Sequence, residues 1–306
     1  MTLAADLSNL PRALAAVEGN TPDAEPRFVG LLAEKWAQQN DDDKPTALGT
    51  RVRHSDAGKC ARAIAYTAAG IAKSDPMDLT GVWNVSLGTM IHEHWQAALV
   101  ERFPGAEIEP KVGHDDLDAS GHLDAIIRTA DRTICYELKT IGGFGFKAAV
   151  GKMGRGKPAE GPKVEHLMQA ALNGLACDAD EVVIGYLAKE CISINQGRDL
   201  PDLARFAAEW TFTREEYEPI AHAEKARLNG ILALLDQGEL AARKFPGGLL
   251  PPGAEITDPT TGRYEVHDGE ALTDFGTWWA CGYCSFRTVC ATTDPGRIPV
   301  ESVVSL

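Results

Sequence analysis

The feature that most constrains the fold of this 306-residue chain is a strand–turn–strand pattern near its middle. Residues 121–127 and 133–141 are rich in β-branched and aromatic residues, and a short polar turn separates them. This pattern predicts a β-hairpin. Side chains two positions apart on a strand face the same way, so Glu137 and Lys139 should project together. The turn should fold Asp124 back beside Glu137.

Two converging carboxylates beside a lysine favour one kind of chemistry. Carboxylate oxygens suit Mg²⁺ or Mn²⁺, which bind phosphate oxygens, activate water and offset the charge that develops when a phosphodiester is cleaved. Lys139 could orient that water or stabilise the transition state. A buried acid–acid–lysine set without a metal would be costly. The alternative interpretation is a solvated strand edge, where acid-x-lysine triplets are common.

Residues 121–124 (Gly-His-Leu-Asp) and 137–139 (Glu-Leu-Lys) resemble the Asp…(Asp/Glu)-x-Lys core of the PD-(D/E)xK nucleases, and the Gly-x-x-Asp form is similar to the RecB branch. Residues 88–92 resemble the helix motif in which RecB-like nucleases place a histidine upstream of the acid. An imidazole ligand would favour Mn²⁺ over Mg²⁺. His94 is the alternative histidine, on another helix face. The metal ligands that the resemblance implies are His92, Asp124, Glu137 and the Leu138 carbonyl.

A helix predicted over residues 164–176 carries a partial match to the next motif of this family. Gln169 fits the first position of Gln-x-x-x-Tyr, but Asn173 occupies the place of the tyrosine. The resemblance therefore implies a role for Gln169 only, and the tyrosine's contact is not carried over. The catalytic residues implied are Asp124, Glu137, Lys139 and Gln169.

Seven cysteines in a chain without an export signal favour metal binding over disulfides, because the cytosol keeps thiols reduced. Cys281, Cys284 and Cys290 form a C-x2-C-x5-C pattern that lets three thiolates reach one centre. Cys60 is the candidate fourth ligand, because it begins a predicted helix beside two cations, Lys59 and Arg62, and both features favour thiolate. The other cysteines, Cys135, Cys177 and Cys191, are interpreted as small core residues.

Four thiolates fit either a structural Zn²⁺ or an iron–sulfur cluster, and the spacing by itself does not choose. The pattern of one distant and three close cysteines resembles the iron–sulfur nucleases of the RecB-like group, including the CRISPR-associated exonuclease family. That resemblance implies a [4Fe-4S] cluster on Cys60, Cys281, Cys284 and Cys290. It also implies exonuclease activity on single-stranded DNA from a 5′ end.

The net charge of −14 is unevenly distributed. Residues 51–75 carry a balance of +3 and residues 139–163 a balance of +5, so basic segments remain available for phosphates. Residues 142–161 contain seven glycines, which predicts a mobile loop without regular structure. The residues expected to contact DNA from the basic loop 142–163 are Lys147, Lys152, Arg155 and Lys157.

The predicted fold class is α/β (α+β), which the resemblance narrows to a PD-(D/E)xK restriction-endonuclease-like core with a central mixed sheet flanked by helices. Further elements should be helices at residues 58–69, 86–102 and 214–244 and a strand at 181–188. Three regions are expected: an N-terminal helical or linker segment (1–50), a nuclease domain (51–270) and a cysteine lobe (271–306) completed by Cys60.

The expected partner is DNA, with single strands preferred, and a homo-oligomer or a recombination or CRISPR-adaptation protein is a further expectation. No apolar run approaches the roughly 18 residues of a membrane span, and the first residues lack the pattern of a signal peptide, so we expect a cytoplasmic protein without a membrane partner. Two alternatives stay open: a DNA-end-binding adaptor of the same fold with little turnover, and an unrelated protein stapled by zinc.

Overall fold

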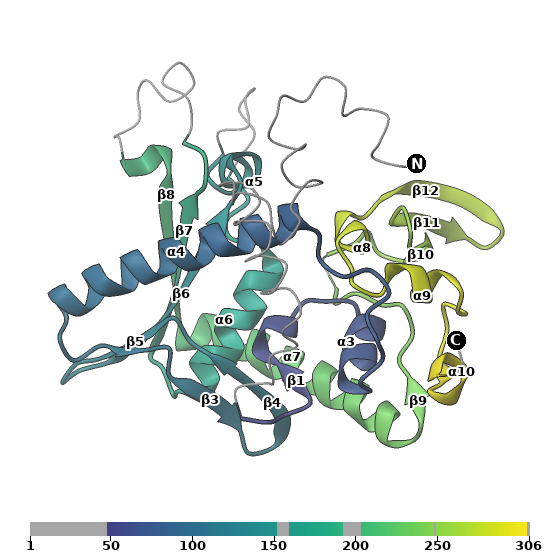
Figure 1. The fold of residues 1–306 in the computed structure, drawn as a ribbon, viewed down its shortest axis with the longest axis horizontal. Coiled ribbons are helices and arrows are strands. Elements are labelled where there is room, and N and C mark those ends of the chain that lie inside the picture. Colours follow the sequence, from purple (N-terminus) through teal and green to yellow (C-terminus); the bar gives the residue numbers. More distant parts are fainter. Residues whose placement is uncertain (1–47, 152–158, 192–202, 248, 305–306) are drawn as a thin grey trace, which may run out of the picture. The chain divides into compact units, whose positions relative to one another are not determined.

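The computed structural model describes residues 48–151, 159–191, 203–247 and 249–304 (Figure 1). The chain divides into two compact units. One unit comprises residues 1–44 and 76–87, of which 76–87 are described; they include the first residues of α4 (Leu79–Arg102). The other unit comprises residues 45–75 and 88–306 and contains every candidate site residue.

The larger unit is built on a five-stranded sheet with the order β2-β5-β6-β7-β8. Its strands are β2 (Glu107–Ile108), β5 (Ala125–Arg128), β6 (Thr133–Ile141), β7 (Glu181–Ala188) and β8 (Ala207–Thr213). Strands β6 and β7 run parallel and the other neighbours antiparallel. The sheet is therefore mixed, as predicted.

Two helices connect the parallel strands, α5 (Gly143–Ala149) and α6 (Val164–Ala176), because a parallel pair needs a crossover connection. Helix α6 lies beside the sheet (Figure 1) and buries a face that includes Ala170, Ala171 and Leu172. Ala170 and Ala171 belong to one apolar cluster with the inward side chains of β6 and β7, whereas Leu172 belongs to a second cluster. Burying a leucine such as Leu172 contributes about 2 kcal/mol.

A second apolar cluster joins segments that are far apart in the sequence. It contains residues of α3 (Ala61–Ala68), of α7 (Arg214–Asp236) and of the C-terminal region around α9 (Arg287–Ala291). The short elements around it are β1 (Val52–Arg53), η3 (His54–Asp56), β3 (Lys111–His114), β4 (Leu117–His122), β9 (Glu239–Leu240), β13 (Ile298–Pro299) and α10 (Glu301–Val304). The strands among them form the sheets β1-β4-β3 and β13-β9.

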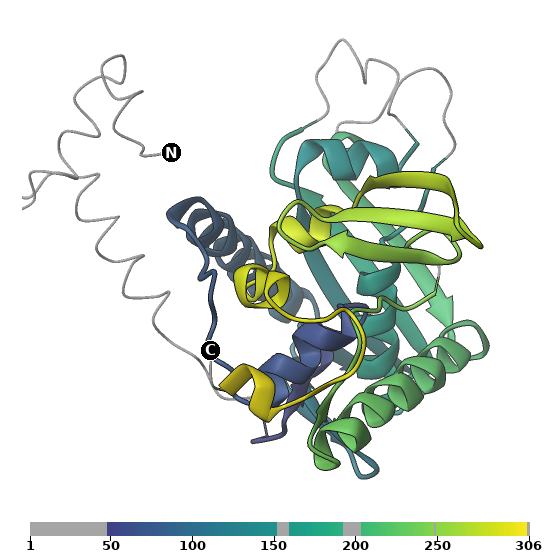
Figure 2. The same ribbon diagram turned by 90° about the vertical axis from the view of Figure 1, so that its right-hand side faces the viewer.

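A fourth sheet, of three antiparallel strands, precedes the C-terminal cysteines. Strands β10 (Ala254–Asp258), β11 (Arg263–Asp268) and β12 (Ala271–Thr277) form a meander, shown in yellow-green in Figure 2. Helix α8 (Trp279–Gly282) follows β12 directly. A further 3-10 turn, η4 (Leu203–Arg205), precedes β8.

Helix α6 and strand β7 have the predicted bounds, and the hairpin pairs β5 with β6 from Ala125↔Tyr136 to Arg128↔Thr133. The predicted strand 121–127 is wrong as one element: it breaks at residues 123–124, because β4 pairs with β3 whereas β5 pairs with β6. Helix 58–69 begins only at residue 61, after η3, whereas helix 86–102 begins at residue 79. Helix 214–244 ends at residue 236, before Gly238 with its positive φ.

The loop predicted over residues 142–161 is wrong in its first part, where α5 forms. Its aromatic residue Phe146 is fully buried with Ala149 in the apolar cluster of the sheet, and this burial outweighs the glycines around it. Lys152, Arg155 and Lys157 lie outside the described residues.

Among the described residues, no helix is both long and apolar enough to cross a membrane. The cytoplasmic location stays a prediction.

Candidate active site

Glu137 lies at the centre of a buried hydrogen-bond network on β6. Its side chain is 3% exposed, and its Oε1 lies 2.6 Å from Lys139 Nζ. Gln169 of α6 joins both residues, because its Oε1 accepts from Lys139 Nζ at 2.9 Å and its Nε2 donates to Glu137 Oε1 at 2.7 Å. The expected grouping of Glu137, Lys139 and Gln169 is therefore present.

Asp124 lies next to this network, in the break between β4 and β5. Its Oδ2 accepts a hydrogen bond from the Leu138 backbone N at 2.6 Å, and its Oδ1 lies 3.0 Å from His92 Nδ1. Gln96 Nε2 donates to the Asp124 carbonyl at 3.3 Å, which helps to fix the break. The hairpin thus returns Asp124 to β6 as the sequence predicted.

The contact with Asp124 defines how His92 can act. An ionised carboxylate only accepts hydrogen bonds, so Nδ1 of His92 is the donor. In the neutral ring, Nε2 then keeps its lone pair, which is the form of histidine that binds metals. Asp124 therefore orients His92, in addition to any role as a ligand of its own.

Asn173, which replaces the tyrosine of the resembled motif, belongs to the network directly. Its Nδ2 donates to Glu137 Oε2 at 2.7 Å, and its Oδ1 lies 2.7 Å from Nδ1 of His54. Since the amide nitrogen is the donor to Glu137, the amide oxygen accepts from His54. Asn173 and His54 are both fully buried. Sequence reasoning missed this pair, because a helical asparagine and a lone histidine carry no distinctive pattern.

Burial lowers the pKa of His54, although the hydrogen bond with Asn173 acts in the opposite direction. Nε2 of His54 has no hydrogen-bond partner within the described part of the chain. Gly121 makes room for this ring, because a Cβ there would lie 3.0 Å from the Cβ and Nδ1 of His54. The glycine of the Gly-x-x-Asp pattern thus has a packing reason.

Burial also raises the pKa of Glu137, and the nearby Asp124 carboxylate acts in the same direction. The Lys139 ammonium and the hydrogen bond from Asn173 oppose this shift. An acid whose ionisation is balanced in this way is typical of a functional site.

The donor types at this site fit a hard divalent cation: two carboxylates, one imidazole and the Leu138 carbonyl. No three or more His, Cys, Asp or Glu side chains of the described residues are arranged as a metal-holding group. Both Glu137 oxygens and Asp124 Oδ2 are engaged by protein donors. Metal binding would require these side chains to exchange partners, and it stays a prediction.

The four candidate cysteines come together in the larger unit although they are distant in sequence. Cys281 and Cys290 are buried, and Cys60 and Cys284 are half-buried. Burial, and then the neighbouring Cys60, Cys284 and Cys290 thiols, raise the pKa of Cys281, so the four cysteines lie in one region of this unit. The described residues do not arrange them as a metal-holding group, and the four-cysteine site stays a prediction.

Burial raises the pKa of Cys281 to about 12 and that of Cys60 to about 11, and the neighbouring thiols add to both shifts. The backbone N–H groups of Ala63 and Arg62 act in the opposite direction on Cys60 but do not prevail. The expectation that a helix start and two cations would favour the Cys60 thiolate is therefore wrong: desolvation dominates.

A buried arginine explains why Cys60 meets the C-terminal cysteines. Arg62, in the first turn of α3, is fully buried and donates to the backbone carbonyls of Ala241, Asp294 and Gly296, and to the Thr293 hydroxyl. The sequence had suggested only a charge beside Cys60. Arg62 instead fastens α3 to the segment that follows Cys290.

Asp75 makes the second connection between these segments. Its carboxylate accepts from the backbone N of Thr288 at 2.7 Å, from the Thr288 hydroxyl at 2.8 Å and from Arg287 Nη2 at 3.0 Å. It therefore caps the first turn of α9, the helix that carries Cys290. Burial alone would raise the pKa of Asp75, but these hydrogen bonds and that from Ser74 hold it at about 2.

A close backbone approach positions the β10–β12 sheet against the cysteines. Gly262 has a φ of +74°, and a Cβ there would lie 2.2 Å from the Trp278 carbonyl oxygen. The Trp278 backbone N also donates to the Gly262 carbonyl at 2.7 Å. Glycine is required here both for the left-handed conformation and for the contact.

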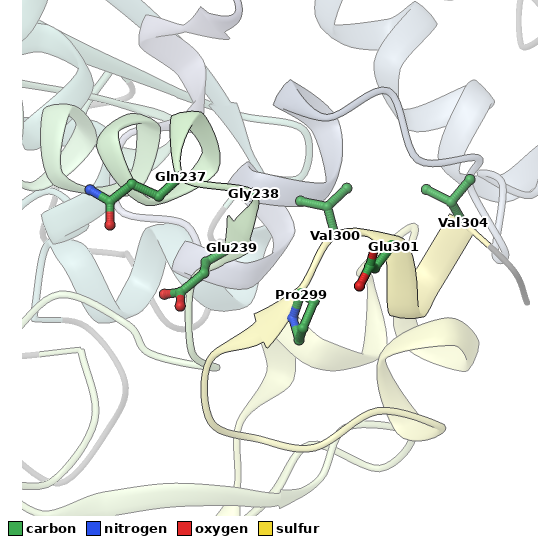
Figure 3. A pocket seen from close by; sticks show the side chains of 7 residues that line it. All are labelled: Gln237, Gly238, Glu239, Pro299, Val300, Glu301 and Val304. Atoms are coloured by element: carbon green, nitrogen blue, oxygen red, sulfur yellow. The ribbon is translucent and has the colours of Figure 1, made fainter.

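A surface pocket lies between the end of α7 and the C-terminal segment (Figure 3). Its lining residues are Gln237, Gly238, Glu239, Pro299, Val300, Glu301 and Val304. None of the candidate catalytic or cysteine residues belongs to it, so it does not define the active site.

No protein-family model matches the chain, and no curated protein matches it. Solved structures do show similarity. SSO0001 is 17% identical, with 89% of this chain and 100% of that chain covered and a TM-score of 0.47. An alkaline exonuclease (LHK-Exo) from Laribacter hongkongensis is 13% identical over 67% of this chain and 96% of its own, with a TM-score of 0.39. A phage-related exonuclease from Haemophilus somnus 129PT is 9% identical over 57% of this chain and 82% of its own, with a TM-score of 0.36.

Proposed function

We propose that this protein is a nuclease of the PD-(D/E)xK type that hydrolyses phosphodiester bonds in DNA with Mg²⁺ or Mn²⁺. The observation that carries the proposal is the buried set formed by Glu137, Lys139 and Gln169 beside the His92–Asp124 pair. A structural salt bridge alone would not need a second carboxylate and a metal-competent histidine next to it.

In this proposal, the metal ligands are His92, Asp124, Glu137 and the Leu138 carbonyl. A bound divalent ion would supply an activated water and offset charge on the phosphate. Lys139 holds its ammonium beside Glu137 Oε1, where it can orient the attacking water and stabilise negative charge. Gln169 fixes both side chains, and Asn173 fixes the second oxygen of Glu137.

The finer features of the proposal come from the sequence resemblance. They are exonuclease action, a preference for single-stranded DNA and degradation from a 5′ end. Lys147 on α5, together with Lys152, Arg155 and Lys157, would contact DNA phosphates and make binding sensitive to salt. A homo-oligomer and recombination or CRISPR-adaptation partners remain further predictions.

We also propose that Cys60, Cys281, Cys284 and Cys290 hold a [4Fe-4S] cluster. The placement of the four thiols in one region supports this, because burial raises the pKa of each thiol and a bound cation would stabilise the thiolate forms there. Iron and sulfide content and the visible spectrum of protein purified without oxygen test the proposal. Iron with sulfide, lost in Cys281→Ala, is expected, whereas zinc alone would contradict it.

The central test of the nuclease proposal uses end-labelled single-stranded and duplex DNA with Mg²⁺ or Mn²⁺. Glu137→Gln keeps the size of the side chain but removes its charge, so cleavage should fall at least about 10³-fold while DNA binding persists. Glu209→Gln, at an exposed carboxylate on β8 of the same sheet, is the matched control and should cleave normally.

The label positions also decide the polarity, since mononucleotide release from a 5′ label and a 3′ label follows different time courses. A wild-type protein that binds DNA but cleaves no substrate with either metal would overturn the nuclease proposal. That result would favour the DNA-end-binding adaptor with the same fold.

A further inference from the structure

Two aromatic side chains beside the cysteine cluster are exposed to solvent. Trp279 is 49% exposed and Tyr283 is 85% exposed, and they stand four residues apart on and directly after α8. Their ring centroids are 6.1 Å apart. Residues at this spacing share one side of a helical turn, so the two rings form a single exposed aromatic face.

Contacts with neighbouring residues hold the two rings in place. Trp278 lies 5.8 Å from Trp279 between ring centroids and also 5.8 Å from Phe245, and its backbone is fixed to Gly262. The Gly282 carbonyl, just before Tyr283, accepts a hydrogen bond from Arg287 Nη1 at 3.2 Å. A supported aromatic face that remains exposed is typical of a binding surface.

A lysine links this face to the candidate active site. Lys163 Nζ lies 4.5 Å from the centroid of the Trp279 ring, and its only close acid is Glu165, at 3.8 Å, among the ion pairs of the described residues. Lys163 is the N-cap of α6, the helix that carries Gln169 and Asn173. His166 lies between Lys163 and Gln169 in the sequence. Its pKa is lowered to about 3, first by burial and then by the charges of Lys139 and Lys163.

Exposed aromatic rings combined with a cation fit one ligand particularly well. Each nucleobase has a π-face that can stack on an aromatic side chain, and each phosphate attracts a lysine. In a duplex these base faces are already stacked, so the surface suits unpaired bases. We propose that Trp279, Tyr283 and Lys163 form a stacking site for single-stranded DNA, adjacent through α6 to the Glu137 network. This inference deepens the proposed nuclease function and rests on it for its biological use.

The test measures binding of a fluorescein-labelled oligo(dT) to the full-length protein in EDTA, where no cleavage occurs. Tyr283→Leu and Trp279→Leu each remove a ring while keeping an apolar side chain, and each should raise Kd about tenfold. Tyr283→Phe keeps the ring and should stay within about twofold of the wild type, because stacking needs the π-face and not the hydroxyl.

Phe275→Leu is the matched control, because Phe275 on β12 is 65% exposed and lies near a cation, Arg263, but is separate from α8. It should leave Kd unchanged. Because Tyr283 is 85% exposed, its replacement should leave the chain folded, and the test stays valid even if Trp279→Leu disturbs α8. Thermal denaturation and the visible spectrum check each variant.

An abasic oligonucleotide of equal length separates stacking from charge. The wild type should bind oligo(dT) more tightly than the abasic strand, and the Leu variants should lose that difference. The proposal would be overturned if the Leu variants bound both oligonucleotides more weakly by the same factor. It would also be overturned if they bound both as tightly as the wild type, and that result would point to a protein partner for this face. With cleavable DNA, the Leu variants should raise KM with little change in kcat.

The stacking site and the nuclease proposal can fail separately. Ring-dependent binding without any cleavage would refute the nuclease but retain the stacking site. Cleavage that needs Glu137 but ignores both rings would retain the nuclease and refute the stacking site.

Discussion

The Glu137 network and the cysteine cluster are both buried, but they are organised in different ways. Around Glu137, side chains bond to side chains, and each carboxylate oxygen accepts from an ammonium or amide. Around the cysteines, Arg62 donates mostly to backbone carbonyls and Asp75 accepts at a helix N-terminus. Burial, followed by the neighbouring thiols, raises the pKa of Cys281. The first site is built by its own side chains, and the second by the segments that carry them.

The largest loss of stability should come from Arg62→Met, which keeps an apolar side chain but removes every hydrogen-bond donor of the guanidinium. The carbonyls of Ala241, Asp294 and Gly296 would lose their partner in the interior, at a cost of about 3–4 kcal/mol in the free energy of unfolding. Urea denaturation measures this. Arg132→Met, at an exposed ion pair with Glu181, is the control and should cost less than about 1 kcal/mol. If Arg62→Met lowered the free energy of unfolding by less than Arg132→Met does, other contacts would hold the cysteine segments together.

The second-largest loss of stability should come from Asn173→Leu, which disrupts the hydrogen-bond network around Glu137. Glu137 Oε2 and His54 Nδ1 would each lose a buried partner, which should cost about 2–3 kcal/mol in urea denaturation. Cleavage should also fall, because Glu137 would no longer be fixed. Asn229→Leu removes an exposed hydrogen bond from α7 to Asp116 and should change stability by less than about 0.5 kcal/mol. If both variants lost the same free energy of unfolding, the buried hydrogen bonds of Asn173 would contribute no more to stability than the exposed hydrogen bond of Asn229.

The smallest effect, and the only one that depends on pH, should come from Asp75→Asn. The folded pKa of Asp75 is depressed to about 2, so its contribution is complete above the unfolded value of about 3.9 and disappears as pH falls toward about 2. The variant should be about 1–2 kcal/mol less stable at pH 7, with the gap closing below about pH 4.

Urea denaturation at a series of pH values follows the closing of this gap. Asp118→Asn, at a partly exposed ion pair with Arg51, should show little difference at any pH. A stability gap for Asp75→Asn that stays constant from pH 7 to pH 3 would contradict the role of its ionised carboxylate.

The sequence predicted the elements whose signals are local and strong. Helix α6 and strand β7 have unambiguous periodicity, and the Asp124 and Glu137–Lys139 positions followed from hairpin geometry. The break between β4 and β5 was missed, because a change of sheet partner depends on β3, which is distant from the pattern. Helix α5 was missed because the tertiary burial of Phe146 outweighs its glycines.

The missed site residues share a physical cause. His54, Asn173 and Arg62 act only through tertiary contacts, at separations of 119 residues for the His54–Asn173 pair and 232 for Arg62–Asp294. No local pattern encodes such a contact. Arg62 and Asn173 could be seen in the sequence, but whether they face solvent or the interior could not.

The long separation bridged by Arg62 also has a consequence for how the chain folds. The residues that receive its guanidinium are made after all five strands of the central sheet, so the sheet can form during synthesis before α3 finds its partner. Closing so large a loop is slow. Until the loop closes, Arg62 and Cys60 remain exposed to water. We therefore expect the cysteine region to be the last part of the larger unit to fold, and a newly made chain to be most exposed to aggregation and proteolysis before this step.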